Sequence, residues 1–138
     1  MTKLIVDASV AAAWLLASQA TRSALDFLEG LHGFEPMAPH VFQWEIGNLL
    51  VRQTRREPGF DLSEALTLLD ACGIASAPPL KRDDLRLLSL FAASRGLSLF
   101  DASYLWLAMG ADAALASRDA GLIKAAHAAG VDVFDLRD

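Results

Sequence analysis

The sequence predicts an α/β fold with a parallel sheet, and two observations favour it. Short apolar segments of strand length alternate along the chain with longer segments that have helical periodicity. Strands that are separated by helices pair in parallel, because each helix carries the chain back across the sheet. The 138 residues contain no internal repeat, low-complexity segment or linker. We therefore expect one domain over residues 1–138.

The first half of the chain opens on the apolar segment KLIV, which suits a short buried strand. Proline has no N–H to donate, so the segment from Pro36 to Pro39 suits a sheet edge or a strand end. The long helical pattern that follows is mostly apolar and ends at Pro58-Gly59. The elements expected in this half are a strand at 3–6, a helix at 10–18, a helix at 21–32, an extended segment at 36–39 and a helix at 40–56.

In the second half, Asp61 has the spacing of a helix cap, with Glu64 at the capping-box position. Glycines at positions 96 and 130 end two further helical patterns. The elements expected here are a helix from residue 61, a weak strand at 73–77, helices at 83–94 and 101–109, a strand at 113–116, a helix at 120–129 and a last strand at 131–134.

The composition indicates a globular protein, with 54% hydrophobic and 21% charged residues. No apolar run approaches the ~20 residues that span a bilayer, and the N-terminus lacks a signal peptide. The single cysteine, Cys72, excludes an internal disulfide and predicts a buried thiol in the reducing cytoplasm. The net charge of −5 argues against binding nucleic acid through overall basicity, unless carboxylates gather around metal ions that reverse the local field.

Three aspartates lie at the ends of apolar runs. Asp7 follows LIV, Asp119 follows the run that contains ALAS, and Asp101 stands near the head of LFDASYLWLA. Ligands of open parallel sheets bind outside the carboxyl ends of the strands, and Asp7 and Asp119 fall at that edge. For each aspartate taken alone, the favoured interpretation is a helix N-cap, which stabilises a helix by about 1 kcal/mol.

Glu45 is the only charged residue in VFQWEIGNLLV. On a helical wheel it lies on one stripe with Val41, Asn48 and Arg52, so we expect it to be partly buried. Burying a carboxylate without a partner costs several kcal/mol. A contact with Arg52 or a hydrogen bond with Asn48 would supply that partner. The other solution is a metal cation that bridges Glu45 to further carboxylates.

Several other kinds of site are unsupported. The chain has no glycine-rich loop followed by Lys-Ser/Thr for phosphate binding, and no Gly-x-Ser-x-Gly for a hydrolase triad. His32, His40 and His127 lack the spacing of zinc ligands. Asp7 has no second acid beside it, as a phosphoacceptor domain would require.

Four motifs in order carry a resemblance that covers essentially the whole chain. They are LIVDASVAAAWLL, EIGNLL, LSLFDASYLWLA and LASRDAGL. With these motifs at these separations, the chain resembles PIN domains, and more narrowly the VapC-type toxin ribonucleases of toxin–antitoxin pairs. Serine stands at position 117 where the family often has threonine, and no fifth acid follows Asp119. The resemblance therefore implies four acids and leaves a second metal site open.

The resemblance implies a parallel sheet in the order 3-2-1-4-5, with the four acids in one pocket where the strand order reverses. Oxygen ligands favour hard cations, so the expected cofactor is Mg²⁺ or Mn²⁺. Asp7, Glu45 and Asp101 would be the principal ligands, and Asp119 would complete the site or hold a second ion. Residues expected to support these acids or contact the substrate are Ser9, Asn48, Ser117 and Arg118.

The implied activity is endonucleolytic cleavage of RNA that leaves a 5′-phosphate, by a hydrolase that dimerises and that a small antitoxin inhibits. Candidate phosphate contacts also include Arg52, Arg55 and Arg56, although these arginines equally suit a solvated helix end. The apolar segments 14–16 and 27–31 are candidates for the antitoxin contact. The aromatic residues expected in the core or an interface are Trp14, Trp44, Tyr104 and Trp106. The alternative is a non-catalytic PIN-like binding module, whose acids are caps or a regulatory metal site.

Overall fold

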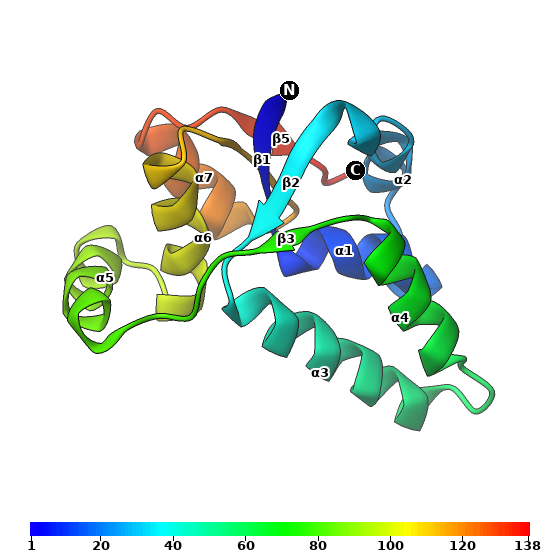
Figure 1. The fold of residues 1–138 in the computed structure, drawn as a ribbon. Helices are drawn as coiled ribbons and strands as arrows, with labels where there is room; N and C mark the ends of the chain where they lie inside the picture. Colours follow the sequence, from blue (N-terminus) through cyan, green and yellow to red (C-terminus); the bar gives the residue numbers. More distant parts are fainter.

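A five-stranded parallel sheet forms the centre of the computed structural model, which describes residues 1–138 (Figure 1). The strands pair in the order β3-β2-β1-β4-β5, and every pair is parallel. This arrangement confirms the predicted fold class and strand order. The strands are β1 (Thr2–Val6), β2 (Phe34–Ala38), β3 (Ala75–Ser76), β4 (Ala114–Ser117) and β5 (Val133–Asp135).

Helices cover both faces of this sheet, because successive residues of a strand point to opposite sides. Ile5 and Leu115 belong to one apolar cluster, whereas Leu4 and Val6 belong to another. None of the helices is long and apolar enough to cross a membrane. The helices are α1 (Ala8–Leu15), α2 (Arg22–Glu29), α3 (Val41–Arg56), α4 (Leu62–Ala71), α5 (Arg82–Arg95), α6 (Leu99–Gly110) and α7 (Ala120–Ala128), with short 3-10 turns η1 (Ala17–Gln19) and η2 (Leu31–Gly33).

Several predicted boundaries were wrong by two residues or more. The first helix starts at Ala8 and ends at Leu15, and the expected helix over 21–32 is interrupted at Gly30. The second strand starts at Phe34, earlier than its prolines indicated. Helix α6 begins at Leu99 rather than at Asp101. Asp61 caps α4 as predicted, since its side chain accepts the N–H of Glu64 at 2.9 Å.

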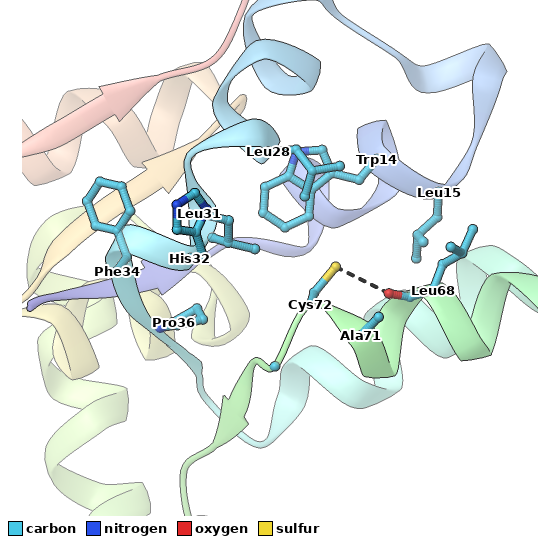
Figure 2. A pocket seen from close by; sticks show the side chains of 11 residues that line it. Trp14, Leu15, Leu28, Leu31, His32, Phe34, Pro36, Leu68, Ala71 and Cys72 are labelled. Atoms are coloured by element: carbon cyan, nitrogen blue, oxygen red, sulfur yellow. Dashed lines mark hydrogen bonds between the residues drawn. The ribbon is translucent and has the colours of Figure 1, made fainter.

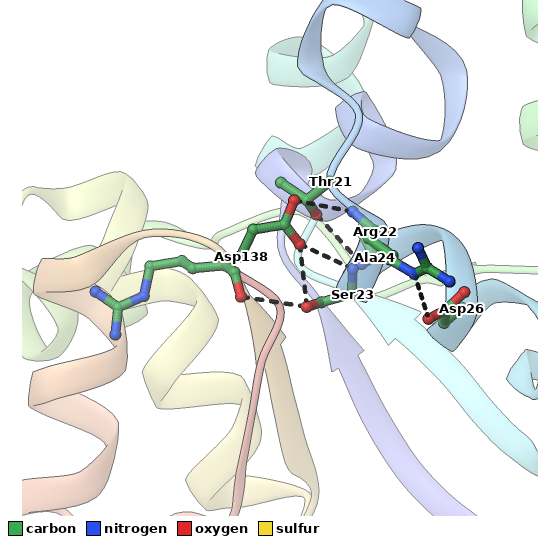
Figure 3. A network of polar contacts seen from close by, with 7 residues as sticks. Thr21, Arg22, Ser23, Ala24, Asp26 and Asp138 are labelled. Carbon is green, nitrogen blue, oxygen red and sulfur yellow. Dashed lines mark hydrogen bonds and ion pairs between the residues drawn. The ribbon is translucent and has the colours of Figure 1, made fainter.

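The last residues of the chain bind the start of α2 (Figure 3). The Thr21 hydroxyl donates to the carbonyl of Leu136 at 2.9 Å. The Asp138 side chain accepts the backbone N–H groups of Arg22 and Ser23, each at 3.0 Å. These bonds satisfy N–H groups that a helix leaves without partners, and they lower the pKa of Asp138. The segment after β5 therefore fixes α2 against the sheet.

Candidate active site

A pocket of about 380 Å³ lies at the carboxyl ends of β1 and β4, where the strand order reverses. All four predicted acids line it, although they come from four separate segments of the chain. Its lining consists of Asp7, Ala8, Ser9, Ala12, Gln19, Glu45, Asn48, Leu49, Arg52, Asp101 and Asp119. Gln19 was not among the predicted site residues, because nothing in the sequence around this turn residue of η1 marks it as part of a site.

Asp7 directly follows β1 and is only 5% exposed. It occupies the N-cap position of α1, but its side chain makes no capping hydrogen bond. Instead, its Oδ2 accepts the hydroxyls of Ser9 and Ser117, both at 2.8 Å. The alternative interpretation of Asp7 as a helix cap is therefore wrong. Two hydroxyls thus hold one oxygen of this carboxylate.

Asp119 is both a helix cap and a residue of the pocket. It is the N-cap of α7, where its Oδ2 accepts the N–H of Leu122 at 2.8 Å. Its own N–H donates to the Ser117 hydroxyl at 3.0 Å, which ties the turn after β4 to the serine that holds Asp7. Asp119 is exposed and lines the pocket. The cap thus fixes the side chain at the pocket rather than excluding it from a site.

Asp101 does not head its helix, contrary to the prediction. Ser98 is the N-cap of α6, and its hydroxyl accepts the N–H of Asp101 at 3.0 Å. Asp101 therefore lies in the first helical turn, where a negative charge interacts favourably with the helix dipole. The Ser98 hydroxyl, three residues before the acid, therefore has a structural role: it caps α6 and so sets the start of the helix that places Asp101 at the pocket.

Glu45 has a partner that the sequence analysis missed. Its Oε1 accepts the hydroxyl of Tyr104 at 2.7 Å, whereas neither Asn48 nor Arg52 bonds to it. The suggestion that Asn48 orients Glu45 is therefore wrong. The prediction that Tyr104 lies in the core was correct, but it assigned no hydrogen-bond partner to the tyrosine hydroxyl. The available signal was its position one turn after Asp101, which places both side chains on one face of α6.

The electrostatics of the pocket disfavour negative charge. Burial raises the pKa values of Asp7, Glu45 and Asp101, and the charges of neighbouring acids raise each of them further. The hydroxyl bonds act in the opposite direction on Asp7 and Glu45, but burial is the larger effect. The only two ion pairs of the protein are Arg22–Asp26 and Arg137–Asp135, so none of the four acids forms an ion pair with a basic side chain.

This donor set fits a hard divalent cation. All the candidate ligands are carboxylate oxygens, which Mg²⁺ and Mn²⁺ prefer, and a cation would supply the missing positive charge. In Glu45 and Asp119 one carboxylate oxygen accepts a hydrogen bond and the other accepts none, and in Asp7 both hydroxyl donors bond to Oδ2. No group of three or more His, Cys, Asp or Glu side chains has the arrangement of a formed metal site.

The predicted substrate contacts divide into two groups. Asn48 and Arg52 are exposed and line the pocket. Arg118 does not line it: its Nη1 donates to the carbonyl of Ser9 at 2.9 Å, and its N–H donates to the Ser9 hydroxyl at 3.1 Å. Arg118 thus joins the turn after β4 to the start of α1. Arg55 and Arg56 are exposed outside the pocket lining.

Comparisons with known proteins agree with this architecture. The family model described as "PIN domain" matches residues 4–128. The structure is similar to that of PAE2754 from Pyrobaculum aerophilum, with a TM-score of 0.67 and 21% identity over 90% of this chain and 84% of that one. It is also similar to FitAcB from Neisseria gonorrhoeae, with a TM-score of 0.60 and 16% identity over 96% of both chains. No curated protein matches the chain significantly. Since the family model covers most of its length, the chain belongs to the PIN domain family.

Proposed function

We propose that this PIN domain is a metal-dependent endoribonuclease of the VapC type, acting as the toxin of a toxin–antitoxin pair. PIN domains are generally nucleases that typically use divalent metals, and many are toxins of such pairs. One observation carries the proposal. Asp7, Glu45, Asp101 and Asp119 line a single pocket, and none of them forms an ion pair with a basic side chain.

In this proposal the four acids hold Mg²⁺ or Mn²⁺ directly or through water. A bound ion supplies an activated water and stabilises the charge that develops on the leaving oxygen. The hydroxyls of Ser9 and Ser117 keep the Asp7 carboxylate in place, and capping of α7 does the same for Asp119. These supporting bonds matter because partners of metal ligands set ligand orientation and basicity.

RNA is the proposed substrate, and local groups at the pocket would contact it. Arg52 offers a positive charge beside the acids, and Gln19 and Asn48 offer hydrogen bonds to phosphate or sugar oxygens. The net charge of −5 makes non-specific attraction to RNA weak. Binding would therefore depend on the bound cation and on these few contacts.

An apolar groove is the proposed contact for the antitoxin (Figure 2). It has a volume of about 640 Å³, and Figure 2 shows Trp14, Leu28 and the α4 residue Leu68 around it. The predicted antitoxin segments need correction, because Leu16 is buried and Phe27 packs against Phe34 and Phe134. Cys72 also lines the groove and is only half-buried, unlike the core thiol predicted.

The occupant of this groove would be an apolar segment of the antitoxin that buries leucine or aromatic side chains between α1 and α4. Dimerisation of the chain and a cytoplasmic location complete the proposal. The side chains of Trp44, Leu90 and Phe100 are apolar and exposed, so a contact between two copies of the chain would bury them.

The test is cleavage of a fluorescent single-stranded RNA by the purified chain, with Mg²⁺ or Mn²⁺ and with a chelator. We expect cleavage only with the metal, and products that carry 5′-phosphates. Asp7→Asn and Asp101→Asn should abolish cleavage, because each keeps the side-chain volume and removes the charge that holds the cation. Asp70→Asn, on the exposed face of α4, is the matched control and should cleave normally.

Two results would contradict the proposal. Undiminished cleavage by both Asp7→Asn and Asp101→Asn would place the activity elsewhere or in a contaminant. A folded chain that binds Mn²⁺ but never cleaves RNA would instead support the non-catalytic binding module.

A further inference from the structure

Tyr104 is the only tyrosine of the chain, and its side chain is fully buried. It belongs to the large apolar cluster on one face of the sheet, together with Leu105 and Ala108 of the same helix. Its one polar atom donates to Glu45 Oε1 at 2.7 Å. A ring enclosed by the core cannot turn away from this contact, so the hydroxyl is a rigidly held donor.

Helix α6 therefore contributes two groups to the pocket from one face. Asp101 supplies a carboxylate, and Tyr104, one turn later, supplies the hydroxyl that holds the carboxylate of a different helix, α3. A glutamate side chain is otherwise free to rotate about three bonds. The bond to Tyr104 removes this freedom for Glu45 and fixes its position relative to Asp101.

The bond also makes the two carboxylate oxygens of Glu45 different from each other. Oε1 is occupied by the hydroxyl, whereas Oε2 accepts no hydrogen bond. Asp7 is held in the same way, with both of its hydroxyl donors on Oδ2. Glu45 therefore has one oxygen that is committed to the hydroxyl and one oxygen that is available for a ligand.

We propose that Tyr104 is a positioning residue that presents Glu45 to a divalent cation through one oxygen only, and so selects Mg²⁺ and Mn²⁺ over Ca²⁺. Mg²⁺ requires a compact octahedron of oxygens, whereas Ca²⁺ takes six to eight oxygens and readily accepts both oxygens of one carboxylate. Committing Oε1 to a hydroxyl disfavours the two-oxygen mode. The inference rests on the proposed metal-dependent function and names the residue that sets its ion preference.

The test compares wild type with Tyr104→Phe, which deletes the hydroxyl and keeps the buried ring. Free Mn²⁺ is measured by electron paramagnetic resonance during titration, and Ca²⁺ is then added as a competitor. We expect Tyr104→Phe to bind Mn²⁺ about tenfold more weakly, in the range found for lost partners of metal ligands. Ca²⁺ should displace Mn²⁺ from the variant at a lower Ca²⁺:Mn²⁺ ratio than from wild type.

RNA cleavage as a function of Mn²⁺ concentration separates positioning from a merely structural role. If Tyr104 positions Glu45, Tyr104→Phe should need a higher Mn²⁺ concentration for half-maximal activity than wild type, and saturating Mn²⁺ should restore most of the rate. A structural role lowers the rate by one factor at every concentration. Ser103→Ala is the matched control, because it deletes a hydroxyl of the same helix that bonds only to the carbonyl of Phe100. It should leave both ion affinities unchanged.

A second measurement does not depend on the folding of the Phe variant. Incorporation of 3-fluorotyrosine labels the sole tyrosine, so the wild-type chain should give one fluorine resonance that shifts when Mg²⁺ binds. An unchanged resonance, or unchanged Mn²⁺ affinity and Ca²⁺ competition in Tyr104→Phe, would overturn the inference while leaving metal-dependent cleavage intact. Failure of wild type to bind Mn²⁺ at all would overturn the proposed function and this inference together.

Discussion

The Ser117 hydroxyl holds two parts of the candidate active site, so its removal gives a sharp prediction. It is fully buried, donates to Asp7 Oδ2 at 2.8 Å and accepts the N–H of Asp119 at 3.0 Å. Ser117→Ala deletes a single oxygen and creates almost no cavity. Its effect should therefore come from the two lost hydrogen bonds.

The expected loss is about 1.5–4 kcal/mol in the free energy of unfolding at neutral pH. A hydrogen bond to a charged group contributes about 1.5–3 kcal/mol, and Asp7 is too buried for water to replace the donor fully. Asp119 is exposed, so water can satisfy much of its N–H, and we add at most about 1 kcal/mol for it. At about 4 °C per kcal/mol for a chain of this length, the melting temperature should fall by about 6–16 °C.

The sign of the pH dependence follows from the charge of Asp7. The Ser117 bond stabilises the ionised carboxylate and so lowers the pKa of Asp7, against the larger effect of burial. Once Asp7 is protonated, only a neutral bond of about 1 kcal/mol is lost. The difference between wild type and Ser117→Ala should therefore shrink as the pH falls through the raised pKa of Asp7.

The assay is urea unfolding of both proteins in chelator at pH 7 and pH 5, with Ser103→Ala as the control. Ser103 sits on the same helix as Asp101 but outside the pocket lining, and its removal should cost less than about 0.5 kcal/mol. If Ser117→Ala lost no more stability than Ser103→Ala at pH 7, the hydroxyl bond to Asp7 would not support the site as described.

Three further predictions concern pH, Arg118 and assembly. Because Asp7, Glu45 and Asp101 have raised pKa values when folded, these three carboxyl groups of the metal-free protein bind more protons in the folded state than in the unfolded state. Their contribution to the free energy of unfolding is fully present below the unfolded pKa of about 4, and it is lost as the pH rises through the folded pKa values. Urea unfolding in chelator should therefore show a larger loss of stability with rising pH for wild type than for Asp101→Asn. Arg118→Ala should lower the free energy of unfolding by about 1–2 kcal/mol through loss of the bond to Ser9, with KM for RNA unchanged; a raised KM at unchanged stability would show a substrate contact instead. Light scattering should give the mass of a dimer, and a monomer at every concentration would contradict the proposed assembly.

The parallel fold could be predicted from the pattern of strands and helices, whereas the strand order and the meeting of the four acids were predicted from the family resemblance. Buried apolar runs mark strands, and the carboxyl ends of neighbouring parallel strands share one edge. This rule was enough to place Asp7 and Asp119 at the same edge of the sheet, and the strand order that the resemblance implies made them neighbours. Asp101 and Glu45 needed the family motifs as well, since each lies on a helix whose rotation the local pattern does not fix.

The supporting bonds could not be predicted in the same way. Tyr104 lies in an apolar run and looks like an ordinary core residue, and only the packing of α6 against α3 brings its hydroxyl to Glu45. Arg118 stands beside an acid of the site, yet the turn after β4 directs its side chain to Ser9. Helix α6 starts at the Ser98 cap, two residues closer to the N-terminus than the aspartate spacing indicated. Each of these depends on tertiary geometry or on competition between caps.

The central claim, that the four acids share a divalent cation, is tested most directly by thermal denaturation of wild type and Asp101→Asn, each in chelator and in Mn²⁺. A cation that binds only the folded state stabilises it by about 2.7 kcal/mol at one hundred times its Kd. Wild type should therefore melt about 10 °C higher in Mn²⁺ than in chelator, and much less so in Na⁺ at matched ionic strength. In chelator, Asp101→Asn should melt no lower than wild type, because burial and neighbouring negative charges raise the pKa of the carboxylate that it removes. In Mn²⁺, the variant should lose most of the gain in melting temperature. Equal gains for both proteins would place the cation outside this pocket, and a variant that melts well below wild type in chelator would make Asp101 a structural residue.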